Sequence, residues 1–171
     1  MAGPRHDTVT GARGLPYLVA LLLAACAIGP RFETGEIDRG LTPANSISRL
    51  PAAEGKQVLW GGVILNTTNL KQRTDVEVLA YPLDGDQKPQ RDARELGRFV
   101  FQTNDYLEPA TYAKDRMVTL VGRLVGSRPG KVGDRDYVYP VVEARQLYLW
   151  PRESDYNTGG VNFGIGVGIG F

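Results

Sequence analysis

The amino-acid sequence predicts an all-β domain. Twenty-one glycines and eleven prolines among 171 residues favour short strands joined by turns. Apolar and β-branched residues gather in five separate runs, and turn-forming residues separate these runs. The length suits one domain, and a hydrophobic fraction of 42% is ordinary for a folded globule.

The first run, 57–65, is apolar on both alternating faces, which is typical of a strand buried on both sides. Gly61 and Gly62 within it predict a bend or a bulge. The polar residues 66–69 predict a turn.

The second strand is expected over 75–81, and Pro82 ends it before a polar loop that runs to Glu95. A third strand is expected over 97–102, with Phe99 and Phe101 on the same face.

The segment 109–114 is the one stretch that favours a short helix. A fourth strand is predicted over 116–125, a hairpin turn over 128–133, and a long last strand over 137–150 that is broken at Pro140. Five strands with one short helix between the third and fourth match a small OB-like barrel, which we place over residues 56–151. An open sandwich of the same strands is the alternative.

Residues 1–25 resemble a secretion signal. Arg5 and Arg13 precede the apolar stretch 15–25, which is about 11 residues long, whereas a membrane-spanning helix needs about 20. Leu23, Ala24 and Ala25 then lead directly into Cys26, the only cysteine. This pattern resembles the bacterial lipoprotein signal, in which the signal peptidase recognises the small residues and the cysteine is acylated. The alternative is a chance cysteine at the end of an ordinary secretion signal.

Lipidation of Cys26 predicts that membrane lipid is the first partner of the chain. Two or three acyl chains give stable anchoring, whereas one chain binds only marginally. Ala27 stands where an aspartate tends to retain such proteins in the inner membrane, so we expect an outer-membrane anchor that faces the periplasm.

The segments on either side of the barrel have a different composition. Residues 26–55 are rich in proline, glycine and polar residues and are expected to form the lipid anchor and tether. Residues 152–171 form a glycine-rich tail in which glycine alternates with apolar residues from Phe163 to Phe171. We expect this tail to dock on the membrane surface or on a partner.

Charge argues against nucleic acid as a partner. Removal of residues 1–25 takes away two of the 20 basic residues and one of the 19 acidic residues, so the remaining chain is formally neutral. A neutral chain has no basic excess to neutralise phosphates.

The sequence also argues against an enzyme, and it predicts neither a metal site nor a cofactor. The only histidine, His6, lies in the signal, and Cys26 is acylated, so histidine-assisted nucleophilic catalysis and the usual zinc ligands are excluded. Asp75 and Glu77 lie two residues apart on one strand face, where an exposed, solvated face explains them better than paired catalytic carboxylates. The Asp84–Asp86 segment lacks the other ligands of a calcium loop and is better explained as a turn.

Five aromatic residues are candidates for a ligand or partner surface, because OB-like barrels often bind sugars or single strands through aromatic rings. The alternative, which we favour, is packing in the core and at its rim. An envelope protein or a glycan is the expected partner of such a surface. The five residues are Trp60, Tyr137, Tyr139, Tyr148 and Trp150.

Seven short motifs between residues 26 and 151 resemble the Slp family of outer-membrane lipoproteins. They are Gly55–Asn69, Glu77–Leu83, Gly97–Phe99, Tyr106–Pro109, Val118–Gly122, Tyr139–Val142 and Leu147–Pro151. The resemblance implies an outer-membrane location and a setting of carbon starvation or stationary phase, and it supplies no catalytic residue.

Two hypotheses therefore stand. One is a non-enzymatic envelope lipoprotein with a structural or stress-related role. The other is a periplasmic module that binds a glycan or another small envelope molecule.

Overall fold

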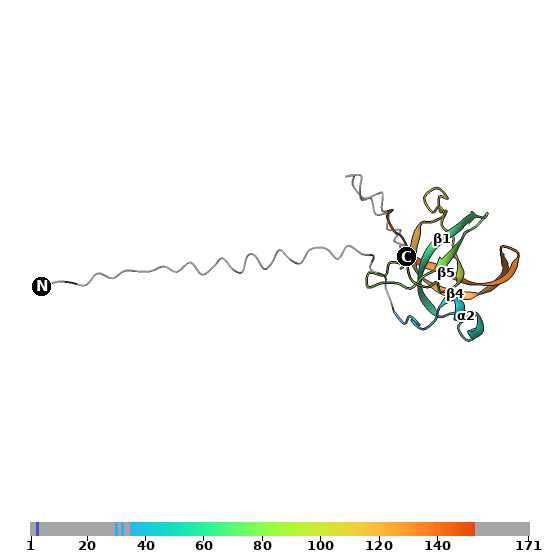
Figure 1. Ribbon diagram of the computed structural model, residues 1–171, viewed down its shortest axis with the longest axis horizontal. Coiled ribbons are helices and arrows are strands. Elements are labelled where there is room, and N and C mark those ends of the chain that lie inside the picture. Colours follow the sequence, from blue (N-terminus) through green and yellow to red (C-terminus); the bar gives the residue numbers. More distant parts are fainter. Residues whose placement is uncertain (1–2, 4–29, 31, 33–34, 153–171) are drawn as a thin grey trace.

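The computed structural model describes residues 3, 30, 32 and 35–152. Within this range five strands and one helix form the domain (Figure 1). The elements are α2 (Pro43–Arg49), β1 (Gln57–Asn69), β2 (Thr74–Ala80), β3 (Arg98–Thr103), β4 (Met117–Val132) and β5 (Arg135–Leu149).

The five strands close into a barrel in the order β1-β2-β3-β5-β4, with β4 paired back onto β1. Every neighbouring pair is antiparallel except β3 and β5, which run parallel from Val100 to Gln102. This arrangement confirms the predicted all-β class and the small five-stranded OB-like barrel.

The barrel encloses a single apolar core. Phe99 and Phe101 of β3 are fully buried, and the Phe99 ring meets the Trp60 ring of β1 edge to face at 5.2 Å. Aromatic pairs prefer this geometry, and each large side chain that is fully buried stabilises the fold by roughly 1.5–3 kcal/mol. Other core side chains come from every strand: Val58, Ile64, Val76, Val78, Val118, Leu120, Leu124 and Val142.

Gly62 allows β1 and β2 to approach closely. A Cβ atom built on Gly62 would lie 2.0 Å from the carbonyl oxygen of Leu79, which is far inside van der Waals contact. The irregularity in β1 itself lies further along, between Ile64 and Asn66, where the register with β2 shifts. Gly61 and Gly62 thus allow neighbouring segments to approach β1 closely, whereas the bulge lies after them, between Ile64 and Asn66.

Two predicted turns are wrong because the strands continue through them. Residues 66–69 extend β1 and pair with β2, and their polar side chains bind the loop before β4: Thr67 Oγ1 donates to the Tyr112 carbonyl at 2.7 Å. Residues 128–132 likewise continue β4, so the hairpin turns at Gly133, whose φ is 59°. Glycine, proline and polar residues are tolerated there because this part of the hairpin extends beyond the closed barrel.

The predicted helix position is also wrong. Residues 109–114 form turns, and the helix α2 lies before β1, within the stretch expected to be a tether. Thr42 caps α2: its side chain accepts from the Asn45 N–H at 3.3 Å, while the Asn45 side chain accepts from the Thr42 N–H at 2.8 Å. Pro43 at the first helical position completes a strong start signal.

The extended hairpin, which we call the ribbon, comprises residues 125–132 of β4 and 135–139 of β5. Ion pairs hold it to the outside of the barrel, since Asp75 of β2 accepts from both Arg128 of the ribbon and Arg73. Asp75 is only 6% exposed, so the solvated face expected for this carboxylate is wrong. Burial of the charge is offset by the two guanidinium groups.

We predict that Gly62→Ala destabilises the fold by about 2 kcal/mol or more, because the new methyl group forces the backbones of β1 and β2 apart. Chemical denaturation measures the free energy of unfolding. Gly85→Ala is the matched control, because a Cβ there meets no atom within 4 Å, and it should change that free energy by less than about 0.5 kcal/mol. Equal effects of the two variants would contradict the role of Gly62.

We further predict that Asp75→Asn lowers the free energy of unfolding by about 1–3 kcal/mol, because two arginines lose their buried anion. Asp136→Asn, whose carboxylate is 95% exposed and 3.8 Å from Lys131, should cause no measurable change. An Asp75→Asn protein as stable as the wild type would show that the ion pairs of Asp75 do not hold the ribbon to the barrel.

Candidate functional site

A groove of about 290 Å³ opens between the segment before β1 and the loop after β2. Residues 37–43, called the strap below, form one wall, and the 82–90 loop forms the other. The floor is Leu59, Trp60 and Gly61, near the start of β1. The lining includes Ile37, Asp38, Arg39, Leu41, Thr42, Pro43, Leu59, Trp60, Gly61, Ala80, Tyr81, Pro82, Leu83, Asp84, Gln87 and Leu96.

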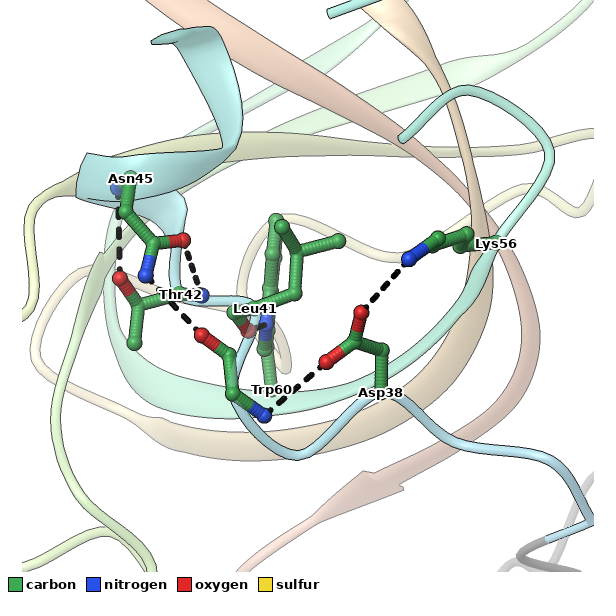
Figure 2. A network of polar contacts seen from close by, with 7 residues as sticks. Asp38, Leu41, Thr42, Asn45, Lys56 and Trp60 are labelled. Carbon is green, nitrogen blue, oxygen red and sulfur yellow. Dashed lines mark hydrogen bonds and ion pairs between the residues drawn. The ribbon is translucent and has the colours of Figure 1, made fainter. Parts of the chain in front are cut away.

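The strap is fixed to the barrel at several points (Figure 2). The indole N–H of Trp60 donates to the Leu41 carbonyl at 2.7 Å, and Leu41 is itself buried. At the start of the strap, Ile37 forms an isolated parallel bridge with Gln57. At its end, the capped helix α2 begins.

An ion pair adds to this attachment. Lys56 lies 2.8 Å from Asp38, whose other carboxylate oxygen accepts from the Gly40 N–H at 3.1 Å. The hydrogen bond from Lys56 lowers the pKa of Asp38 below its usual value, against a smaller opposing effect of burial. Because the folded-state pKa is the lower one, the pair favours the folded strap at neutral pH. This contribution is lost as the pH falls through the folded-state pKa.

The 82–90 loop is held down by buried hydrogen bonds. Thr119 of β4 is fully buried and donates to the Gln87 carbonyl at 2.7 Å, while it accepts from the Trp150 indole at 2.9 Å. Gly61 permits this approach, because a Cβ there would lie 2.8 Å from the Thr119 hydroxyl and 2.9 Å from Leu83. The loop is therefore placed by the barrel.

Gln87 is the unusual residue of the groove. Its φ is 66°, a left-handed conformation that is uncommon for residues other than glycine. Its side-chain Oε1 is buried and finds no hydrogen-bond partner among the residues that the structure describes. Gln87, which lines the groove, therefore carries an unused hydrogen-bond acceptor.

The five predicted aromatic residues do not form one surface. Trp60 lies in the core, 5% exposed, and its indole is occupied by the Leu41 carbonyl. Tyr137 and Tyr139 pair edge to face at 4.7 Å near the ribbon, and Tyr148 and Trp150 pair at 4.9 Å near the other end of β5. Tyr139 and Tyr148 are nine residue steps apart along β5, a path of up to about 30 Å.

The tyrosine pair on the ribbon serves structure. The Tyr139 hydroxyl contacts Glu77 at 3.1 Å and donates to the Lys131 carbonyl at 2.9 Å, and Arg98 binds Glu77 at 2.8 Å. Burial, followed by the charge of Glu77, raises the pKa of Tyr139. Tyr137 accepts from the Arg98 N–H at 2.9 Å. These contacts agree with the packing role that the sequence favoured.

Two of the predicted aromatic residues support the groove: Trp60 holds the strap through the Leu41 carbonyl, and Trp150 holds the 82–90 loop through Thr119. The ammonium group of Lys88 in the 82–90 loop also lies 5.9 Å from the centre of the Trp150 ring.

No sequence pattern predicts the groove itself, because the strap is expected to be part of a tether and Gln87 part of a polar loop. Two signals indicate structure before β1: the Thr42–Asn45 cap, and the apolar residues Ile37, Leu41, Ile47 and Leu50, which could pack onto the domain. Asp84 caps its own turn, its Oδ1 accepting from the Asp86 and Lys88 N–H groups at 2.9 Å each. Across the described part of the chain, no three histidine, cysteine, aspartate or glutamate side chains are grouped to hold a metal ion.

The predicted signal, Leu23 to Ala25, and the lipidation site Cys26 lie outside the described residues, as does the glycine-rich tail after Arg152. No helix in the described segments has the length and apolar character needed to cross a membrane.

Comparison with known proteins places these features in a family. The model of the family described as "Outer membrane lipoprotein Slp family" matches residues 23–164. An uncharacterized protein of Haemophilus influenzae is 38% identical over 60% of this chain, although the match spans only 56% of that protein.

Two proteins of Escherichia coli K12 are similar over a longer range. Outer membrane protein Slp is 28% identical over 82% of this chain and 75% of its own length. The uncharacterized lipoprotein YeaY is 27% identical over 77% of this chain and 68% of its own length.

Solved structures resemble the chain only distantly. The mitochondrial single-stranded DNA-binding protein Rim1 of Saccharomyces cerevisiae shares 11% identity at a TM-score of 0.35, over 56% of this chain and 95% of that one. A small single-stranded DNA-binding protein of Streptomyces coelicolor shares 13% identity at a TM-score of 0.34, over 54% and 92%.

The family match extends over most of the chain and includes the barrel, the strap and the 82–90 loop. The chain belongs to the Slp family of outer membrane lipoproteins, and its location is the outer membrane.

Proposed function

We propose that this protein is a non-enzymatic lipoprotein that is anchored to the outer membrane through acylated Cys26 and faces the periplasm. The observation that carries the proposal is the placement of Leu23, Ala24 and Ala25 directly before the only cysteine of the chain. The chain after Cys26 contains no histidine and no other thiol, which supports a binding or structural role.

The strap limits the distance between the anchor and the barrel. Ile37 is the first residue bridged to β1, and eleven residue steps from Cys26 to Ile37 span at most about 40 Å. A tether that continued to residue 55 would reach more than twice as far. We therefore propose that the barrel stays close to the lipid surface, where it contributes to envelope structure or to adaptation under stress or starvation.

We predict that Cys26→Ala abolishes lipid labelling and leaves the protein uncleaved or soluble, because the thiol that carries the acyl chains is gone. Growth with a clickable fatty acid, followed by separation of the membranes, measures both results. The control is Ala27→Ser, which preserves the thiol and should remain labelled in the outer-membrane fraction. Normal retention of Cys26→Ala without lipid label would contradict the anchor.

A second candidate function is binding of a glycan or another small envelope molecule. The specific observation that favours it is Gln87, which lines the groove and whose buried Oε1 has no hydrogen-bond partner among the described residues. Pockets that bind small molecules combine apolar surface with placed polar groups, and the groove offers leucines beside Gln87, Arg39 and Asp84.

We predict that a ligand of this groove raises the thermal unfolding temperature of the full chain saturably, because it binds the folded state alone. A thermal-shift panel of envelope glycans and peptides measures the effect. The control is the variant Leu59→Trp, in which a larger side chain in the groove should remove the shift. A shift that survives in this variant would place the ligand elsewhere.

A further inference from the structure

We infer that the groove binds a short peptide with an apolar side chain and with both termini charged. This inference rests on the second candidate function, ligand binding in the groove, and names the class of ligand. It is carried by three features of the lining: its leucines, the amide of Gln87, and two charged groups that form no ion pair with another described residue.

The size and part of the lining favour a small ligand that carries an apolar side chain. The groove volume of about 290 Å³ lies just below the range of about 300–1,000 Å³ for small-molecule sites. Leu59, Leu83 and Leu96 provide surface for an apolar side chain. A sugar ring presents hydroxyl groups around its rim, and those that face the leucines would lack a partner.

Gln87 matches a peptide group. A carboxamide carries one acceptor oxygen and one donor nitrogen in a plane, and a peptide unit offers the complementary N–H and C=O. No residue in the described ranges hydrogen-bonds to the buried Oε1. The backbone of Gln87 is held at both ends: its carbonyl accepts from Thr119, and its N–H donates to the Asp84 carbonyl at 3.0 Å. Little further ordering of this backbone is therefore needed when a ligand binds.

The charges match the two ends of a peptide. Asp38 is already neutralised by Lys56, whereas Arg39 and Asp84 form no ion pair with other residues that the structure describes. One guanidinium and one carboxylate therefore remain in the lining of the groove. They complement the carboxylate and the ammonium group of a free peptide.

The test uses the full chain in nanodiscs of phosphatidylethanolamine and phosphatidylglycerol, with calorimetry as the measurement and empty nanodiscs as blank. The probes are alanyl-leucine, its C-terminal amide, its N-acetyl form and the glycan N,N′-diacetylchitobiose. We expect saturable binding of alanyl-leucine, and binding about tenfold weaker for each form that lacks one charged end.

Variants assign each contact. The Arg39→Gln variant should bind the C-terminal amide of the peptide as well as it binds alanyl-leucine, because the group that recognises the carboxylate is gone. The Asp84→Asn variant should bind the N-acetyl form as well as it binds alanyl-leucine, because the group that recognises the ammonium is gone. Asp84→Asn keeps a side-chain oxygen for the turn of the loop. Gln87→Gly removes the amide, suits the left-handed φ, and should weaken alanyl-leucine about tenfold or more without loss of thermal stability. Arg91→Gln, Asp86→Asn and Gln90→Ala are the matched controls, since these three exposed residues lie in or beside the same loop and line no part of the groove.

The outcomes separate the two proposals. Binding of diacetylchitobiose without alanyl-leucine would overturn the peptide inference and leave ligand binding in place. Equal binding of the charged and the capped peptides would overturn the assignment of Arg39 and Asp84, and with it the inference. Absence of saturable binding by any probe would overturn both, and would mean that Gln87 is satisfied by water alone.

Discussion

The hydrogen bond from the Trp60 indole to the Leu41 carbonyl is the contact on which the groove depends. A tryptophan in an apolar core needs an acceptor for its N–H. The strap provides this acceptor, and its Leu41 is buried in the same core. Trp60 therefore both fills the core and holds the strap in place as one wall of the groove.

The 82–90 loop, which forms the opposite wall, is likewise held to the barrel by a hydrogen bond from a buried side chain. Thr119 faces outward from β4, where it is buried only because the 82–90 loop covers it, and its hydroxyl joins the loop to Trp150. Gln87 is held in a left-handed conformation as a result. A left-handed backbone and a buried polar atom without a partner coincide at Gln87, and this combination is typical of functional sites.

Much of the barrel could be predicted because its signals are local. The apolar alternation around Val76 and Phe99 predicted the strands and their inward faces, and the number of strands predicted the barrel.

The ends of the strands and the position of the helix could not be predicted in the same way. Residues 66–69 read as a turn by composition, but they pair with β2 because the loop near Tyr112 satisfies their polar side chains. The groove depends on contacts between residues far apart in sequence, such as Trp60 with Leu41, so no single segment contained its signal.

The ribbon has a consequence for a protein held on a crowded lipid surface. From Val125 to Val132, β4 pairs with β5 alone in the part of the chain that the structure describes, so its other backbone edge is open. Neighbouring copies confined to two dimensions meet such edges far more often than copies in solution, and open edges promote strand-to-strand aggregation. Pro129 lacks the N–H that a neighbouring strand would need, and Lys131 places a charge near the tip. The sequence of the ribbon thus opposes fibre-like association where lipid anchoring would most encourage it.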